Sequence, residues 1–188
     1  MRSFIAIELP ESAKSALAGL QQELKESGAD VRWVKPEHIH LTLKFLGDVG
    51  SEVIDSLIQV LKGTCREGNP FSIEIRGTGV FPHARSPRVI WAGVSGGAAL
   101  AALQRDIERG LSALGFDSEE RPFVPHLTVG RVRSSLGKRQ LIEKVDGFRD
   151  ALFAEVDVRS VALMKSDLSP AGAHYTALAR ISLGKGFD

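Results

Sequence analysis

A near-repeat within the 188 residues limits how this chain can fold. The tetrapeptide His-Leu-Thr-Leu begins at His40, and His-Leu-Thr-Val begins at His126, 86 positions later. Polar and apolar residues alternate in both copies, which is typical of β-strands, and a glycine follows each copy closely. Residues two apart on a strand point to the same side, so each copy presents a histidine and a threonine on one face. The chain therefore contains two similar strands, and a two-lobed arrangement is open to it.

The remaining sequence predicts intermixed helices and strands. Apolar residues recur every three or four positions in three segments, which predicts helices over residues 13–24, 51–62 and 100–114. β-rich or alternating segments predict strands over residues 4–7, 31–34, 40–46, 71–75, 88–92, 126–132, 153–158, 161–165 and 175–181. No long Pro- or Gly-rich linker divides them, and we expect a single domain over residues 1–188.

Charge and cysteine content exclude several classes of protein. The formal net charge is only +1, so no global field draws the chain toward polyanions, and a polyanion site must be local. The single Cys65 cannot close an internal disulfide or supply a multi-cysteine zinc site. No uncharged stretch is long enough to span a bilayer, and the apolar run at the N-terminus is too short for a secretory signal. We expect a cytoplasmic protein without a membrane partner.

The two motifs bring together residues suited to phosphate chemistry. The first strand has a core-like apolar face, made by Leu41, Leu43 and Phe45. Strict alternation then turns His40, Thr42 and Lys44 toward a cleft or solvent. Histidine titrates near neutral pH, so one copy can act as a base and another as an acid. Threonine hydroxyls can donate hydrogen bonds to phosphate oxygens. Displacement at phosphorus needs this combination.

A local run of positive charge surrounds the second motif. Five basic residues and no acidic one lie between positions 121 and 142: Arg121, Arg131, Arg133, Lys138 and Arg139. For Lys138 and Arg139 we favour an ordinary solvated face. Arg131 is the better phosphate contact because it closely follows the motif. Strict alternation places Arg131 on the face opposite His126, unless Gly130 permits a β-bulge.

The sequence resembles the two-histidine phosphoesterase superfamily, and within it the RNA 2′,3′-cyclic phosphodiesterases long called 2′-5′ RNA ligases. The resemblance covers nearly the whole chain and rests on four segments: RSFIAIELP, RWVKPEHIHLTLKFLGDV, PFVPHLTVGRV and LMKSDLSPAGAHYTALARISL. It implies an α+β fold with two pseudo-symmetric lobes, in which two antiparallel sheets face a central groove and the helices lie outside.

The resemblance also implies a reaction: water opens a terminal RNA 2′,3′-cyclic phosphate to a 2′-phosphate, with no metal and no other cofactor. In that scheme His40 is the proton donor and His126 the proton acceptor, while Thr42 and Thr128 hold the phosphate oxygens. Arg131 matches a basic residue that follows the second motif in similar proteins. The substrates would be RNA ends or small 2′,3′-cyclic nucleotides. No protein partner is implied, and we expect a monomer. Spacing alone does not tell which histidine is the acid.

Aromatic residues offer possible platforms for a nucleobase. Phe45 and Tyr175 could stack on a base, although alternation favours the core for Phe45. Trp33 and Trp91 fit the core or the rim of a site better than a base platform. His38 follows Pro36 closely, and we expect it in a loop.

Three rival functions remain open. A metal-dependent hydrolase could use His38, His40 and His126 as ligands, although that reading leaves the two threonines unexplained. A non-catalytic module could bind a nucleotide or an RNA end in the same groove. A 2′-5′ RNA ligase would run related chemistry in reverse with the same acid and base, and sequence does not exclude it.

Overall fold

The computed structural model describes residues 1–169 and 172–185. Its helices are α1 (Glu11–Lys25), α2 (Ile54–Glu67), α3 (Gly97–Ser112) and α4 (Lys138–Gly147), with short 3₁₀ turns η1 (Pro36–His38) and η2 (Ser51–Val53). Its strands are β1 (Arg2–Glu8), β2 (Val31–Trp33), β3 (His40–Asp48), β4 (Phe71–Phe81), β5 (Val89–Ser95), β6 (His126–Val132), β7 (Leu152–Val158), β8 (Ser160–Ser169) and β9 (Gly172–Ser182). No helix in this part of the chain is both long and apolar enough to cross a bilayer.

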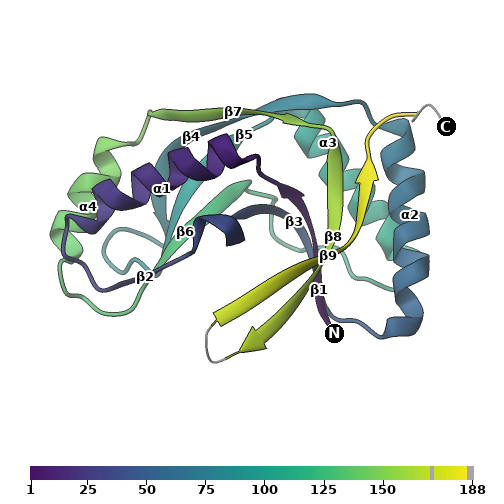
Figure 1. Cartoon of the computed structure of the whole chain (residues 1–188), viewed down its shortest axis with the longest axis horizontal. Coiled ribbons are helices and arrows are strands. Elements are labelled where there is room, and N and C mark those ends of the chain that lie inside the picture. Colours follow the sequence, from purple (N-terminus) through teal and green to yellow (C-terminus); the bar gives the residue numbers. More distant parts are fainter. Residues whose placement is uncertain (170–171, 186–188) are drawn as a thin grey trace.

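The strands form two antiparallel sheets (Figure 1). Sheet A has the order β3-β1-β8-β9, and sheet B has the order β2-β6-β5-β4-β7. The expected α+β fold with two antiparallel sheets, one in each lobe, is confirmed. One histidine-threonine motif lies in each sheet, on β3 and on β6.

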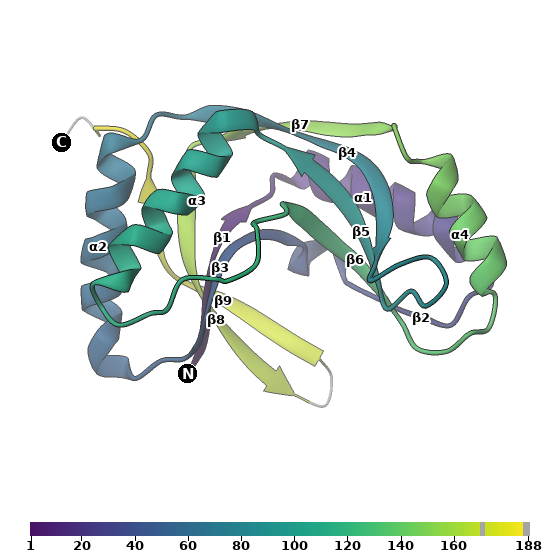
Figure 2. The same cartoon turned by 180° about the vertical axis from the view of Figure 1, so that it is seen from behind.

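Each sheet is covered by two helices on the face away from the motifs. Helices α1 and α4 lie on the lobe of sheet B, and α2 and α3 lie on the lobe of sheet A (Figures 1 and 2). The α1 side chains that are buried recur at helical spacing, as in Ala13, Leu17, Leu20 and Leu24. This spacing gives α1 an apolar stripe that is removed from water by packing on the lobe of sheet B.

The two lobes are interleaved along the sequence. Sheet A combines β1 and β3 with β8 and β9 from the far end of the chain, and β2 joins sheet B although it lies between β1 and β3 in sequence. Helix α1 follows β1 of sheet A yet contacts β7 and α4. One continuous apolar core runs through both lobes and includes Ile5, Leu41 and Leu127.

Most expected elements are present, and one helix was missed. The three expected helices correspond to α1, α2 and α3, and β6 has the expected bounds. Helix α4 was not predicted because it buries only Leu141 and Val145, which is too few residues for a clear helical period. It begins after Gly137, whose φ of +65° is in the left-handed region that favours glycine.

Candidate active site

The two histidines occupy equivalent positions in the two sheets. His40 is the first residue of β3, and His126 is the first residue of β6. These strands belong to different sheets but contact one another where the lobes meet. Thr42 and Thr128 follow two residues later, and all four side chains are half-buried. We call the side of each sheet that carries these four residues its groove face.

A β-bulge in β3 changes which residues share the groove face. On β1, Ala6 pairs with Thr42 and Ile5 pairs with Lys44, so Leu43 is the extra residue. Phe4 then pairs with Phe45. Because Phe4 and Ala6 lie on one side of β1, their partners Thr42 and Phe45 also share a side.

This bulge corrects two expectations. Phe45 does not belong to the core: it is 64% exposed and lies on the groove face with His40. Lys44, expected in a cleft or solvent, is 3% exposed on the opposite face. Its Nζ donates to Glu108 Oε2 and to the carbonyl of Asp117, both at 2.7 Å. Strict alternation predicted the wrong side for both residues, because residues that follow a bulge point to the side opposite to the one that alternation assigns them.

A second bulge occupies the matching position in β6. Trp91 of β5 pairs with Thr128 and Ile90 pairs with Gly130, so Val129 is the extra residue. This is next to Gly130, where the sequence allowed a bulge. Val89 then pairs with Arg131 on the same side of β5 as Trp91. Arg131 therefore shares the groove face with His126 and Thr128.

The two bulges give the motifs a common geometry. In each strand the third residue after the histidine is the extra one, and the fifth residue after it returns to the groove face. That fifth position is Phe45 in sheet A and Arg131 in sheet B. The groove thus has an exposed aromatic ring on one side and a cation at the equivalent place on the other.

The His40 ring lies in an aromatic surround. It stacks on Phe4 at 4.6 Å between ring centroids and meets Tyr175 edge-on at 5.0 Å. Burial among these rings disfavours the charged imidazolium and lowers the pKa of His40 to about 4. A backbone hydrogen bond at His38 and the nearby Glu8 carboxylate act in the opposite direction but more weakly.

His126 is oriented by its own strand. Its Nδ1 lies 2.7 Å from the carbonyl oxygen of Val124. A carbonyl only accepts hydrogen bonds, so Nδ1 carries a proton and Nε2 of the neutral ring keeps a free lone pair. Phe81 meets the ring edge-on at 5.0 Å and limits its rotation. At His40, the backbone of the residue two positions earlier, His38, likewise favours the imidazolium and acts to raise the pKa of His40.

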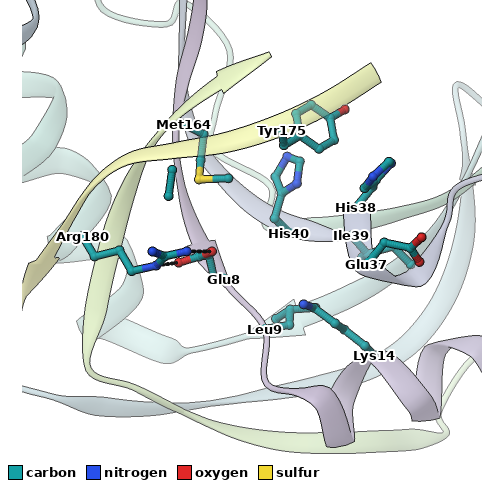
Figure 3. A pocket seen from close by; sticks show the side chains of 11 residues that line it. Glu8, Leu9, Lys14, Glu37, His38, Ile39, His40, Met164, Tyr175 and Arg180 are labelled. Atoms are coloured by element: carbon teal, nitrogen blue, oxygen red, sulfur yellow. Dashed lines mark hydrogen bonds and ion pairs between the residues drawn. The ribbon is translucent and has the colours of Figure 1, made fainter. Parts of the chain in front are cut away.

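A small pocket adjoins His40 (Figure 3). Its volume is about 120 Å³, below the roughly 300 to 1,000 Å³ of pockets that bury a whole small ligand. Arg180 and Glu8 both line the pocket, and Arg180 donates to both carboxylate oxygens of Glu8 at 2.6 and 3.0 Å. This contact lowers the pKa of Glu8. Tyr175, Lys14 and His38 also line the pocket.

The sequence did not single out Phe4, Glu8 or Arg180. No motif marks them, because they reach His40 only through the pairing of β1 with β3 and β8 and of β8 with β9. Tyr175 was singled out, and its ring is placed edge-on against His40, His38 and Phe4. It therefore forms a wall of the histidine pocket.

Other residues considered from the sequence lie elsewhere or in supporting positions. His38 ends the 3₁₀ turn η1 and faces Tyr175. Trp33 packs on the core, whereas Trp91 lies on the groove face over Gly79 with its Nε1 buried. Lys138 and Arg139 begin α4. Among residues 1–169 and 172–185, no three His, Cys, Asp or Glu side chains are arranged to hold a metal ion.

Gln21 of α1 supports the β6 bulge from the core side. This side chain is 3% exposed, and its Nε2 donates to the carbonyls of Val34 and Val129 at 2.6 and 2.8 Å. The backbone N–H of Val34 also donates to the Val129 carbonyl. The carbonyl of the extra residue is thus satisfied although it has left the regular ladder.

Comparison with known proteins matches this geometry to a family. The model of the 2′-5′ RNA ligase superfamily matches residues 9–170 of the chain. The chain belongs to this superfamily.

Three relatives illustrate a similarity that covers nearly the whole of both chains. A Methanothermobacter thermautotrophicus protein named RNA 2′,3′-cyclic phosphodiesterase is 39% identical over 94% of this chain and 95% of its own. A solved structure from Thermus thermophilus has a TM-score of 0.83 at 30% identity, covering 99% of this chain and 100% of the other. LigT from E. coli without ligand has a TM-score of 0.76 at 25% identity, covering 97% of both chains.

Proposed function

We propose that this protein hydrolyses the terminal 2′,3′-cyclic phosphodiester of RNA to a 2′-phosphomonoester by metal-independent acid-base catalysis. The observation that carries the proposal is the placement of one histidine-threonine pair on the groove face of each sheet, on strands that contact one another. The names of the relatives, RNA 2′,3′-cyclic phosphodiesterase, support the same reaction and substrate class.

His126 is the base in this scheme. Its Nδ1 proton is held by the Val124 carbonyl, so the free lone pair of Nε2 is available to take a proton from water. The water oxygen attacks phosphorus while the bond from phosphorus to the ribose 3′ oxygen breaks. Thr42 and Thr128 donate to the non-bridging phosphate oxygens, and Arg131 contributes positive charge to the same substrate.

His40 is the acid and gives a proton to the departing 3′ oxygen. Its lowered pKa of about 4 means that the free protein holds the ring mostly neutral at pH 7. A phosphodiester anion bound beside the ring favours the imidazolium and raises that pKa again. His40 therefore acquires its proton together with the substrate. Tyr175 and Phe4 hold the ring in place during this step.

The test uses an oligoribonucleotide that ends in a 2′,3′-cyclic phosphate, incubated in EDTA. We expect the wild type to form a 2′-phosphate, and we expect His40→Ala and His126→Ala to lower kcat by about 10² to 10⁴, the usual contribution of an acid or base. His174→Ala is the matched control, because His174 is exposed and lies one residue from Tyr175, on the other side of β9.

Each of several outcomes would contradict the proposal or favour a rival function. A 3′-phosphate product would reverse the leaving group, and loss of activity in EDTA would require a metal. Full activity in either histidine variant would remove that residue from the chemistry. Binding of the RNA end without turnover would favour a non-catalytic module. Joining of the cyclic end to a 5′-hydroxyl RNA in the same assay would indicate a 2′-5′ ligase, which uses the same acid and base.

A further inference from the structure

Strand β3 has two ways of pairing with β1, and a buried ion pair distinguishes them. In the observed register Leu43 is the extra residue, so Lys44 points to the core side and Phe45 points to the groove face. In a regular strand, alternation would place Lys44 in the groove and Phe45 in the core. Residues 41–46 contain no glycine to favour a bulge. Contacts outside the strand therefore select the register.

The partners of Lys44 lie on helix α3, which packs on the lobe of sheet A, and just beyond it (Figure 2). Lys44 Nζ donates to Glu108 Oε2 and to the carbonyl of Asp117, both at 2.7 Å. Gln104, one helical turn before Glu108, donates from Nε2 to Glu108 Oε1 at 3.2 Å. The side chains of Lys44, Gln104 and Glu108 are all buried. Both oxygens of the Glu108 carboxylate thus accept hydrogen bonds, one of them from a cation.

This ion pair is compatible only with the bulged register. If β3 were regular, Lys44 would point away from α3, and the buried Glu108 carboxylate would lose its cation. A buried charge without an opposite charge is costly, because water no longer solvates it. The same argument applies to Lys44, whose ammonium is stable on the core side only while Glu108 neutralises it. The pair therefore favours the bulged strand over the regular one.

We propose that Glu108 is a positioning residue for the groove: by pairing with Lys44 on the core side, it holds the β3 bulge and keeps Phe45 on the groove face. There Phe45 lies 6.2 Å from Phe4 between ring centroids, and Phe4 stacks on His40. This position leaves the Phe45 ring free to stack on a nucleobase. Glu108 thus acts on RNA binding from α3 without touching the substrate. The inference rests on the proposed function, because it takes an RNA end as the ligand.

A labelling experiment on Glu108→Leu tests the register without turnover. We expect the unpaired ammonium of Lys44 to leave the core side and to react with acetic anhydride as fast as that of the exposed Lys62, measured by peptide mass spectrometry after a brief pulse. In the wild type, Lys44 should stay protected. The fully buried thiol of Cys65 reports unfolding in the same sample. Asp106→Leu, an exposed acidic position on the same helix, is the matched control and should leave Lys44 protected.

Kinetics on an oligoribonucleotide with a 2′,3′-cyclic end test the consequence for RNA. We expect Glu108→Leu to lower kcat/KM by about the same factor as Phe45→Ala. In the Glu108→Leu background, Phe45→Ala should have no further effect, because both changes remove the same ring from the groove. Adding Lys44→Met to Glu108→Leu should restore kcat/KM, because an uncharged side chain can stay buried beside a leucine.

The outcomes separate this inference from the proposed function. Protection of Lys44 in a folded Glu108→Leu protein would overturn the inference. Independent effects of Glu108→Leu and Phe45→Ala on kcat/KM would also overturn it, as would a failure of Lys44→Met to restore kcat/KM. If Glu108→Leu does not fold, Glu108→Gln removes the charge with little change of shape and is tested in the same way. A wild type that opens no cyclic phosphate would contradict the proposed function alone, and the labelling would still test Glu108.

Discussion

His40 shows how the neighbours of one residue set its chemistry. The ring is enclosed by Phe4 and Tyr175, and its pKa falls to about 4, whereas an unfolded histidine titrates near 6.5. Between these two values the unfolded chain binds more protons than the folded one. The free energy of unfolding is therefore not reduced by His40 above about pH 6.5, and it is progressively reduced as the pH falls toward 4.

We predict that lowering the pH decreases the free energy of unfolding of the wild type more than that of a variant without the His40 ring. Between pH 7 and pH 5, His40 should remove about 2 kcal/mol of the free energy of unfolding, since one pKa unit corresponds to about 1.4 kcal/mol. Urea unfolding at the two pH values measures this, with His40→Gln as the comparison. Equal losses in both proteins, or an NMR midpoint for His40 near 6.5, would contradict the buried state of the ring.

Phe45 is the residue for which a core position and a groove position predict opposite results. It is 64% exposed, so we expect Phe45→Ala to change the free energy of unfolding by less than about 1 kcal/mol. Stacking of a base on an aromatic ring contributes about 1 to 3 kcal/mol, so kcat/KM on RNA should fall roughly 5- to 150-fold. A large loss of stability with unchanged kinetics would contradict the groove position and indicate that Phe45 packs in the core. Leu41→Ala, a fully buried neighbour, is the control for such a loss.

At the scale of elements, the bulges in β3 and β6 decide which residues reach the groove. Gln21 holds the extra residue of β6 through the Val129 carbonyl and also holds the Val34 carbonyl. We predict that Gln21→Met destabilises the fold by about 1 to 3 kcal/mol, the cost of leaving buried polar groups unsatisfied. Its exposed neighbour allows a matched substitution, Gln22→Met, which should be nearly neutral. Thermal or urea unfolding of both variants gives the comparison, and equal stabilities would show that Gln21 is dispensable.

The same bulges mark where sequence reasoning succeeds and where it stops. The motif histidines and threonines were predicted because period-two alternation holds up to the bulge in each strand. Beyond the bulge, Gly130 signalled the reversal in β6, and no glycine signals it at Leu43 in β3. Lys44 and Phe45 were therefore assigned to the wrong faces. Phe4, Glu8 and Arg180 join the site through strand pairing between distant segments, which local pattern does not encode.

At the scale of the whole molecule, the two lobes share one core and exchange segments. We predict that they unfold together in a single transition, because sheet A needs strands from both ends of the chain and one apolar core runs through both lobes. Trp33 and Trp91 both belong to sheet B, so their fluorescence reports that lobe, while far-ultraviolet circular dichroism reports both. Coincident urea curves are expected. A second transition seen only by circular dichroism would mean that the lobe of sheet A unfolds independently.

The strand order of sheet A also has a consequence for synthesis. Strand β1 is flanked by β3 and β8, so before residues 160–182 are made this sheet is a two-stranded ribbon, which is marginal in water by itself. Both histidines have then been translated, but the strand that carries Tyr175 has not yet been made. The His40 side of the groove is therefore completed last, and a growing chain has no finished site until its final strand has been made.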